Sequence, residues 1–209
     1  MISGAFPIPG REIKRAMRVN AFSLGLAIEK CGGTPPPIEM TSDRFAQDLF
    51  PDLDLIAQKG FNDEVDERDK ALATVGPDCQ DLLPGLAAYE DWRDLFHDWT
   101  VLAETTQAES TALAATKAHA AACLRDRSGL TVDDADPTTY LRSVNIEMSA
   151  DGTTRADSLR YASIYAECTR GYFNTMGSEL AKRRSQLVER NRELLERFAR
   201  ELAGAGYVP

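Results

Sequence analysis

Four cysteines are the residues of this chain whose chemistry is most readily interpreted. Cys31, Cys79, Cys123 and Cys168 are widely and almost evenly spaced, so no two of them form a Cys-x-x-Cys pair. A thiolate zinc site or a thioredoxin-type redox motif needs such a pair, and the whole chain has only two histidines to complete a metal site. The even number of cysteines favours disulfides. Four buried free thiols in a cytosolic protein are the alternative.

The surroundings of the cysteines favour one pairing among the three that four cysteines allow. Cys31 and Cys123 each stand at the end of a helical stretch that glycine soon follows, whereas Cys79 and Cys168 each precede a long amphipathic stretch. This weak internal duplication predicts the disulfides Cys31–Cys79 and Cys123–Cys168. Spacing alone leaves the other two pairings open.

The two histidines carry a weaker signal. His97 and His119 lie about six helical turns apart on one predicted helical stretch, so they cannot share a metal within one molecule. Neither has the glutamate three residues earlier that a di-iron bundle needs, and the signatures of haem attachment, zinc proteases and phosphate loops are absent. Cys123 follows His119 by four residues but cannot act as a nucleophile within a disulfide. We therefore expect no catalytic residue, metal or cofactor.

Two rows of aromatic residues recur at helical spacing. The first row is Tyr89, Trp92, Phe96 and Trp99, and the second is Tyr161, Tyr165 and Tyr172. Such rows could line a ligand cleft between helices, but large rings at this spacing more often remove their apolar area from water in a core. We predict that both rows are mainly core, with one ring partly exposed. A ligand cleft along the first row is the alternative.

The chain is acidic, and its negative charge is uneven. The net charge is -9, while residues 37–95 alone hold fifteen Asp or Glu and five Lys or Arg, a balance of -10. This composition argues against nucleic acid and anionic membranes as partners, and it suits a basic protein partner. The densest carboxylates are Asp63, Glu64, Asp66, Glu67 and Asp69. They lack the calcium-loop pattern, so they are either a solvated surface or a docking surface for that partner.

The stretches that carry these residues all have helical periodicity. Apolar residues recur from about Arg11 to Cys31, where Gly32 and Gly33 end the helix, and again from Leu86 to Leu124 as one long helix or two nearly collinear ones. A last element runs from Thr153 or Thr154 to about Ala203 and is weakened at Gly171 and Gly177. Its final third carries an apolar stripe that needs a partner helix, formed by Leu187, Val188, Leu194, Leu195, Phe198 and Leu202.

Shorter helices are expected from Ser42 or Asp43 to Leu49, from Pro51 to Gly60, and from about Thr138 to Met148. No strand pattern is present. The sequence thus predicts an all-α, disulfide-stapled helical bundle with long central and C-terminal helices. We expect one domain, residues 1–209, with the weak duplication dividing it at about residues 11–100 and 101–203.

The sequence has no apolar run long enough to span a membrane, and its first ten residues lack the features of a signal peptide. The cysteines nevertheless favour export, because disulfides persist in oxidising compartments. We therefore expect a secreted or cell-surface protein whose precursor carried a signal sequence.

Several segments resemble those of a family of exported helical proteins and lipoproteins from actinobacteria that carry four cysteines. The segments are Glu-Lys-Cys31-Gly-Gly, Arg44-Phe45 through Gly60-Phe61, Cys123-Leu-Arg, Tyr165-Ala-Glu-Cys168 and Val188-Glu-Arg-Asn191. In that family methionine typically follows the first cysteines, where this chain has Gly32 and Leu124. The resemblance implies an extracytoplasmic location and structural cysteines, and it transfers no catalytic residue.

These observations favour a non-catalytic binding or protein-interaction protein. The alternative is an enzyme, or a cofactor- or metal-binding protein, whose site lies in the bundle core between the two aromatic rows.

Overall fold

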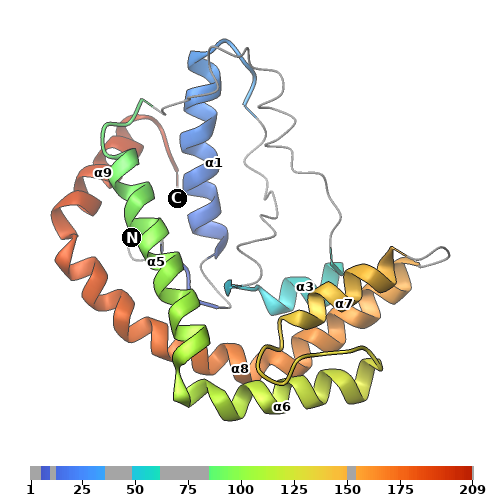
Figure 1. The fold of residues 1–209 in the computed structure, drawn as a ribbon. Coiled ribbons are helices and arrows are strands. Elements are labelled where there is room, and N and C mark those ends of the chain that lie inside the picture. Colours follow the sequence, from blue (N-terminus) through green and yellow to red (C-terminus); the bar gives the residue numbers. More distant parts are fainter. Residues whose placement is uncertain (1–5, 10–12, 36–48, 62–84, 150–153, 209) are drawn as a thin grey trace.

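The computed structural model describes residues 6–9, 13–35, 49–61, 85–149 and 154–208, and these ranges contain helices, turns and loops but no strand. Figure 1 shows the arrangement of the helices. They are α1 (Ile13–Lys30), α3 (Leu53–Lys59), α5 (Tyr89–Glu109), α6 (Thr111–Ser128), α7 (Thr139–Met148), α8 (Arg155–Arg190) and α9 (Arg192–Gly204). The predicted all-α class is confirmed.

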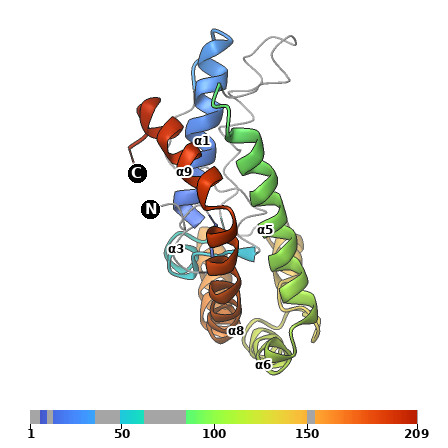
Figure 2. The ribbon, with the colours of Figure 1, turned by 90° about the vertical axis from the view of Figure 1, so that its left-hand side faces the viewer.

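Helix α8 is the element on which the others pack. Helices α3, α5, α6, α7 and α9 all contact it. In Figure 2, α8 and α6 are seen nearly along their axes, side by side at the lower end of the molecule, while α1 and α5 rise above them. The face that α8 turns inward carries large apolar side chains along most of its length, among them Tyr161, Tyr165, Tyr172, Phe173, Met176 and Leu180. Burial of this area is the main source of stability for the packing.

The long helix α8 is visibly curved (Figure 1). The hydroxyls of Thr169, Thr175 and Ser178 donate to backbone carbonyls four residues earlier, at 2.7, 3.0 and 3.0 Å. Such hydrogen bonds draw on the carbonyls of the helix and tend to bend it. Gly171 and Gly177, which the sequence marks as weak points, both lie inside this helix without ending it. The curvature lets one helix contact partners that lie in different directions.

The ends of α8 show one prediction that is right and one that is wrong. At its start Thr154, one of the two caps that the sequence predicts, forms a reciprocal capping box with Asp157, and the hydrogen bonds from Thr154 hold the pKa of Asp157 below its ordinary value. The predicted unbroken helix to Ala203 is wrong. The helix is interrupted at Asn191. The side-chain amide of this residue donates to the carbonyl of Leu187 at 2.9 Å and so competes with the backbone hydrogen bonds of the helix.

The central stretch Leu86–Leu124 is neither one helix nor two collinear helices. Ser110 is extended, with φ -70° and ψ 116°, and separates α5 from α6. Figure 1 shows the two helices running in clearly different directions from this residue. The break contains no glycine or proline. Serine can adopt an extended backbone by itself, and it is common at the position before the first residue of a helix.

Glycine ends two helices where the sequence predicts it. Gly32, with φ +73°, follows α1, and the N–H of Gly33 donates to the carbonyl of Ile28 at 3.0 Å, which satisfies a carbonyl of the last turn. Gly60, with φ +82°, ends α3 against α8. A Cβ at Gly60 would stand 2.8 Å from the Oγ atom of Ser158, so the close contact between the two helices requires glycine.

The shorter helices follow their predicted positions. Asp52, directly after Pro51, caps α3 by accepting a hydrogen bond from the backbone N–H of Leu55 at 3.0 Å. Helix α7 occupies the range predicted after Pro137. The helix expected to end at Leu49 falls, apart from Leu49 itself, outside the described residues.

Helix α9 packs against α5. Helix α5 is thus the partner that the apolar stripe of α9 requires. Leu195, Phe198 and Leu202 are buried. At the edge of this contact the carboxylate of Glu201 accepts a hydrogen bond from the backbone N–H of Ala88 at 2.9 Å. That N–H stands at the start of α5, where no helical carbonyl can accept it, so a carboxylate there is favourable.

A disulfide joins Cys123 in α6 to Cys168 in α8, with Cα atoms 5.6 Å apart, as the sequence predicts. Cys31 is also in a disulfide. Its predicted partner, Cys79, lies outside the described residues, so that pairing stays a prediction. Within the described ranges, no helix combines the length and the apolarity that crossing a membrane would require.

Replacing both Cys123 and Cys168 with serine should lower the free energy of unfolding by about 4 kcal/mol, because the disulfide closes a loop of 45 residues and restrains the unfolded chain. Equilibrium denaturation measures the loss. Peptide mapping without reductant provides the control, since it should recover the two cysteines in one linked fragment. Four alkylatable thiols in the native wild-type protein would contradict the assignment.

Candidate functional site

The first aromatic row lies on α5 and is mainly core, as predicted. The side chains of Trp92 and Trp99 are 2% and 0% exposed, Tyr89 is buried, and Phe96 is half-buried. Phe198 of α9 stacks on Trp92, with ring centroids 5.1 Å apart and an angle of 22° between the rings. The row therefore joins α5 to α9, and only Phe96 reaches toward solvent.

The second aromatic row, on α8, is also core. Tyr161, Tyr165 and Tyr172 are buried, and the ring of Tyr140 from α7 stacks on Tyr165 at 5.9 Å and 4°. The hydroxyl of Tyr140 donates to the carbonyl of Tyr161 at 3.1 Å. Burial raises the pKa of Tyr140 and of Tyr172 far above the ordinary value, so both hydroxyls are neutral at physiological pH.

The two rows serve different parts of the core. The first contacts Phe198, and through Trp99 also Phe6. The second contacts Tyr140, Phe61 and Phe173. Among the described residues no ring contact joins one row to the other. The ring packing therefore gives no support to a shared core site between the rows.

The two indole groups of the first row differ in their hydrogen bonds. The Nε1 atom of Trp99 donates to the carbonyl of Pro7 at 2.9 Å. The Nε1 atom of Trp92 is buried and has no acceptor among the described residues.

The histidines lie on two helices with different directions, whereas the sequence predicts one long helix or two nearly collinear ones for this stretch. His97 is exposed on α5 and His119 is exposed on α6, on opposite sides of the break at Ser110. No group of three or more His, Cys, Asp or Glu side chains in the described ranges is placed to hold a metal ion.

The acidic stretch is only partly described. The five carboxylates of the predicted docking surface, Asp63, Glu64, Asp66, Glu67 and Asp69, lie outside the described residues. Within the described part, Asp54 pairs with Arg170 of α8 at 2.8 Å, and Asp91 pairs with Arg197 of α9 at 2.6 Å. These two carboxylates connect the acidic stretch to the C-terminal helices, so their charge is partly neutralised within the molecule.

Negative charge continues along α5 beyond the stretch that the sequence singled out. The side chain of Asp94 is 78% exposed and lies 3.9 Å from Arg93. Asp98, Glu104 and Glu109 are exposed and form no ion pair with the described part of the chain. We call Asp94, Asp98, Glu104 and Glu109 the acidic side of α5. Three of these four carboxylates, Asp98, Glu104 and Glu109, lie beyond residues 37–95, the range in which the sequence indicates the excess of negative charge.

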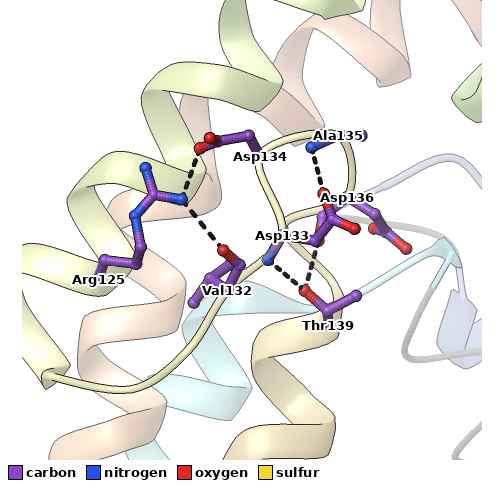
Figure 3. A network of polar contacts seen from close by, with 7 residues as sticks. All are labelled: Arg125, Val132, Asp133, Asp134, Ala135, Asp136 and Thr139. Carbon is purple, nitrogen blue, oxygen red and sulfur yellow. Dashed lines mark hydrogen bonds and ion pairs between the residues drawn. The ribbon is translucent and has the colours of Figure 1, made fainter.

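A polar network that the sequence analysis did not identify fixes the loop between α6 and α7 (Figure 3). Arg125 donates to the carbonyl of Val132 at 3.0 Å and pairs with Asp134 at 2.5 Å. Asp133 accepts from the backbone N–H of Ala135 at 2.8 Å, two residues on. The signal for this turn was present in the sequence, because aspartate commonly bonds the backbone two residues later.

The same loop carries a carboxylate whose charge acts on Tyr172 of α8. Burial raises the pKa of Tyr172, Gln107 of α5 lowers it, and the charge of Asp136 raises it. Asp136 also accepts hydrogen bonds from the backbone and hydroxyl of Thr138, at 2.9 and 2.7 Å.

We expect Trp92→Ala to lower the free energy of unfolding by about 3–5 kcal/mol, since the truncation removes a buried ring stacked between two helices. Val101→Ala is the matched control on the same helix, because Val101 is 45% exposed and its loss should change stability by less than about 1 kcal/mol. Thermal and denaturant unfolding of both variants gives the comparison. Equal stability of the Trp92 variant and the wild type would contradict a core role.

Comparison of the chain with protein-family models, curated proteins and solved structures finds no match. The resemblance to exported actinobacterial proteins therefore stays a hypothesis that depends on the quoted segments alone.

Proposed function

We propose that this chain is a non-catalytic interaction protein that acts outside the cytoplasm and binds a basic protein partner. The observation that carries the proposal is the state of the cysteines, because Cys31, Cys123 and Cys168 are all in disulfides. Structural disulfides are rare in reducing compartments and common in exported proteins. The aromatic rows agree with a non-catalytic protein, since most of their rings are buried and pack against other helices.

Surface charge supports a basic partner. The sequence of α5 carries six Asp or Glu and one Arg, and the loop between α6 and α7 carries Asp133, Asp136 and the Arg125-paired Asp134. Of these, Asp98, Glu104 and Glu109 are exposed without an ion pair among the described residues. A concentrated field of one sign attracts a partner of opposite charge and speeds its encounter at low salt.

The binding hypothesis predicts the behaviour of two neutralised variants of the full chain. One carries Asn or Gln at Asp63, Glu64, Asp66, Glu67 and Asp69, and the other carries them along the acidic side of α5. Each should keep the wild-type circular dichroism and melting temperature while its affinity for the basic partner, isolated from the native culture, falls about tenfold or more at low salt. Titration at low and high salt measures both effects.

The matched control neutralises four exposed or half-buried carboxylates of α8 and α9, namely Glu179, Glu189, Glu193 and Glu196. It changes the net charge of the chain as much as the α5 variant does. We expect it to bind almost as tightly as the wild type. Equal losses in the control and in both neutralised variants would show that only the total charge matters, and affinity independent of salt would overturn the proposed surface.

Location is tested separately by thiol labelling. In cells of the native source, a membrane-impermeant maleimide followed by denaturation and a second label should find no free thiol on this protein, and the protein should be recovered outside the cytoplasm. A cytoplasmic protein with four labelled cysteines would refute the compartment while leaving the charge argument standing.

A further inference from the structure

Residues 6–9, with the sequence Phe-Pro-Ile-Pro, lie between α5 and α8. Phe6 is 0% exposed, and its ring meets Trp99 of α5 edge-on with centroids 6.2 Å apart. The carbonyl of Pro7 accepts the hydrogen bond from the indole N–H of Trp99 at 2.9 Å, and this contact is buried. A tetrapeptide from the start of the chain thus fills part of the core.

Helix α8 supplies the other side of the contact. Arg184 donates to the carbonyl of Phe6 at 3.4 Å. A Cβ added at Gly177 would stand 3.8 Å from both the Cδ atom and the carbonyl oxygen of Pro9, which is ordinary van der Waals contact, so this part of α8 lies directly against Pro9. Trp99, Gly177 and Arg184 define what we call the α5–α8 slot.

The slot and the tetrapeptide are chemically complementary. The slot has two hydrogen-bond donors, the indole N–H of Trp99 and the guanidinium of Arg184. The tetrapeptide accepts these hydrogen bonds with two backbone carbonyls. Pro7 and Pro9 have no N–H, so they bring no backbone donor that the slot would have to satisfy. Proline also restricts the backbone before binding, which lowers the entropy lost when the segment becomes ordered.

These contacts have the character of peptide recognition. The hydrogen bonds join residues 92 and 178 positions apart in the sequence, so they do not arise from local chain geometry. We propose that the α5–α8 slot is a recognition site for a Phe-Pro-x-Pro peptide. In this structure the chain's own Phe6–Pro9 occupies the slot, and a partner protein that presents such a peptide binds by displacing it. The inference is independent of the acidic side of α5.

Competition with the internal segment sets the expected behaviour. A segment tethered to its own slot has an effective concentration of roughly millimolar order, so a free peptide should bind the wild type weakly. Phe6→Ala removes the buried ring of the internal segment and leaves the slot residues unchanged. A free peptide that retains phenylalanine should therefore bind this variant about tenfold or more tightly than it binds the wild type.

The probe is a fluorescent synthetic peptide with the sequence of residues 3–10, titrated into the full-length wild type and the Phe6→Ala variant with anisotropy as the readout. A second peptide with alanine in place of phenylalanine should bind neither protein. The first peptide should also raise the melting temperature of the Phe6→Ala variant and leave that of the wild type almost unchanged, because only the variant has an accessible slot.

Gly177→Val in the Phe6→Ala background tests the place of binding, since added methyl groups occupy the space beside Pro9 and should abolish peptide binding. If Phe6→Ala does not fold, Phe6→Leu serves as the weakened internal segment. Absence of peptide binding to a folded Phe6 variant would overturn the proposal. Equal binding of the alanine peptide, or unchanged binding after Gly177→Val, would do the same.

Discussion

The buried face of α8 is the constraint on which the rest of the structure depends. An all-helical chain has no sheet to present a common apolar surface, so each amphipathic helix must find another helix to cover its apolar side. In this protein α8 is the common partner that α3, α5, α6, α7 and α9 all contact. A straight helix would present its inner face in one direction, whereas the curvature of α8 lets early and late partners approach from different sides (Figures 1 and 2). The hydrogen bonds from the hydroxyls of Thr169, Thr175 and Ser178, which favour this curvature, thus help to position the partner helices.

Helical periodicity and helix-stopping glycines predicted most elements, because these signals are local to the chain. Gly32 and Gly60 ended their helices where expected, and Thr154 began α8. The breaks at Ser110 and Asn191 were not predicted, since a polar residue is compatible with a helix interior and only the packing of α6 and α9 in new directions selects the break. The aromatic core was predictable for the same local reason. The insertion of Phe6 was not, because four residues have no periodicity and their contacts are distant in sequence.

Charge shows a different limit of sequence reasoning. A count of carboxylates located the acidic region, but it could not distinguish unpaired carboxylates from those that pair with an arginine of another helix. Asp54 and Asp91 look alike in the sequence, and both pair with arginines of the C-terminal helices. Exposed pairs of this kind contribute little stability individually. Their larger effect is on the field, since they remove charge near α3 and the start of α5 and leave the middle and end of α5 as the more negative part.

The disulfide between Cys123 and Cys168 makes the intervening chain a covalent ring. That ring contains the end of α6, the loop fixed by Arg125, the whole of α7 and the first turns of α8. A single cut by a protease anywhere within it separates no fragment from the molecule, because both new ends remain joined through sulfur. The loop is exposed, as loops that proteases attack usually are. Such a nick would leave the two halves of the protein attached for as long as the disulfide stays oxidised.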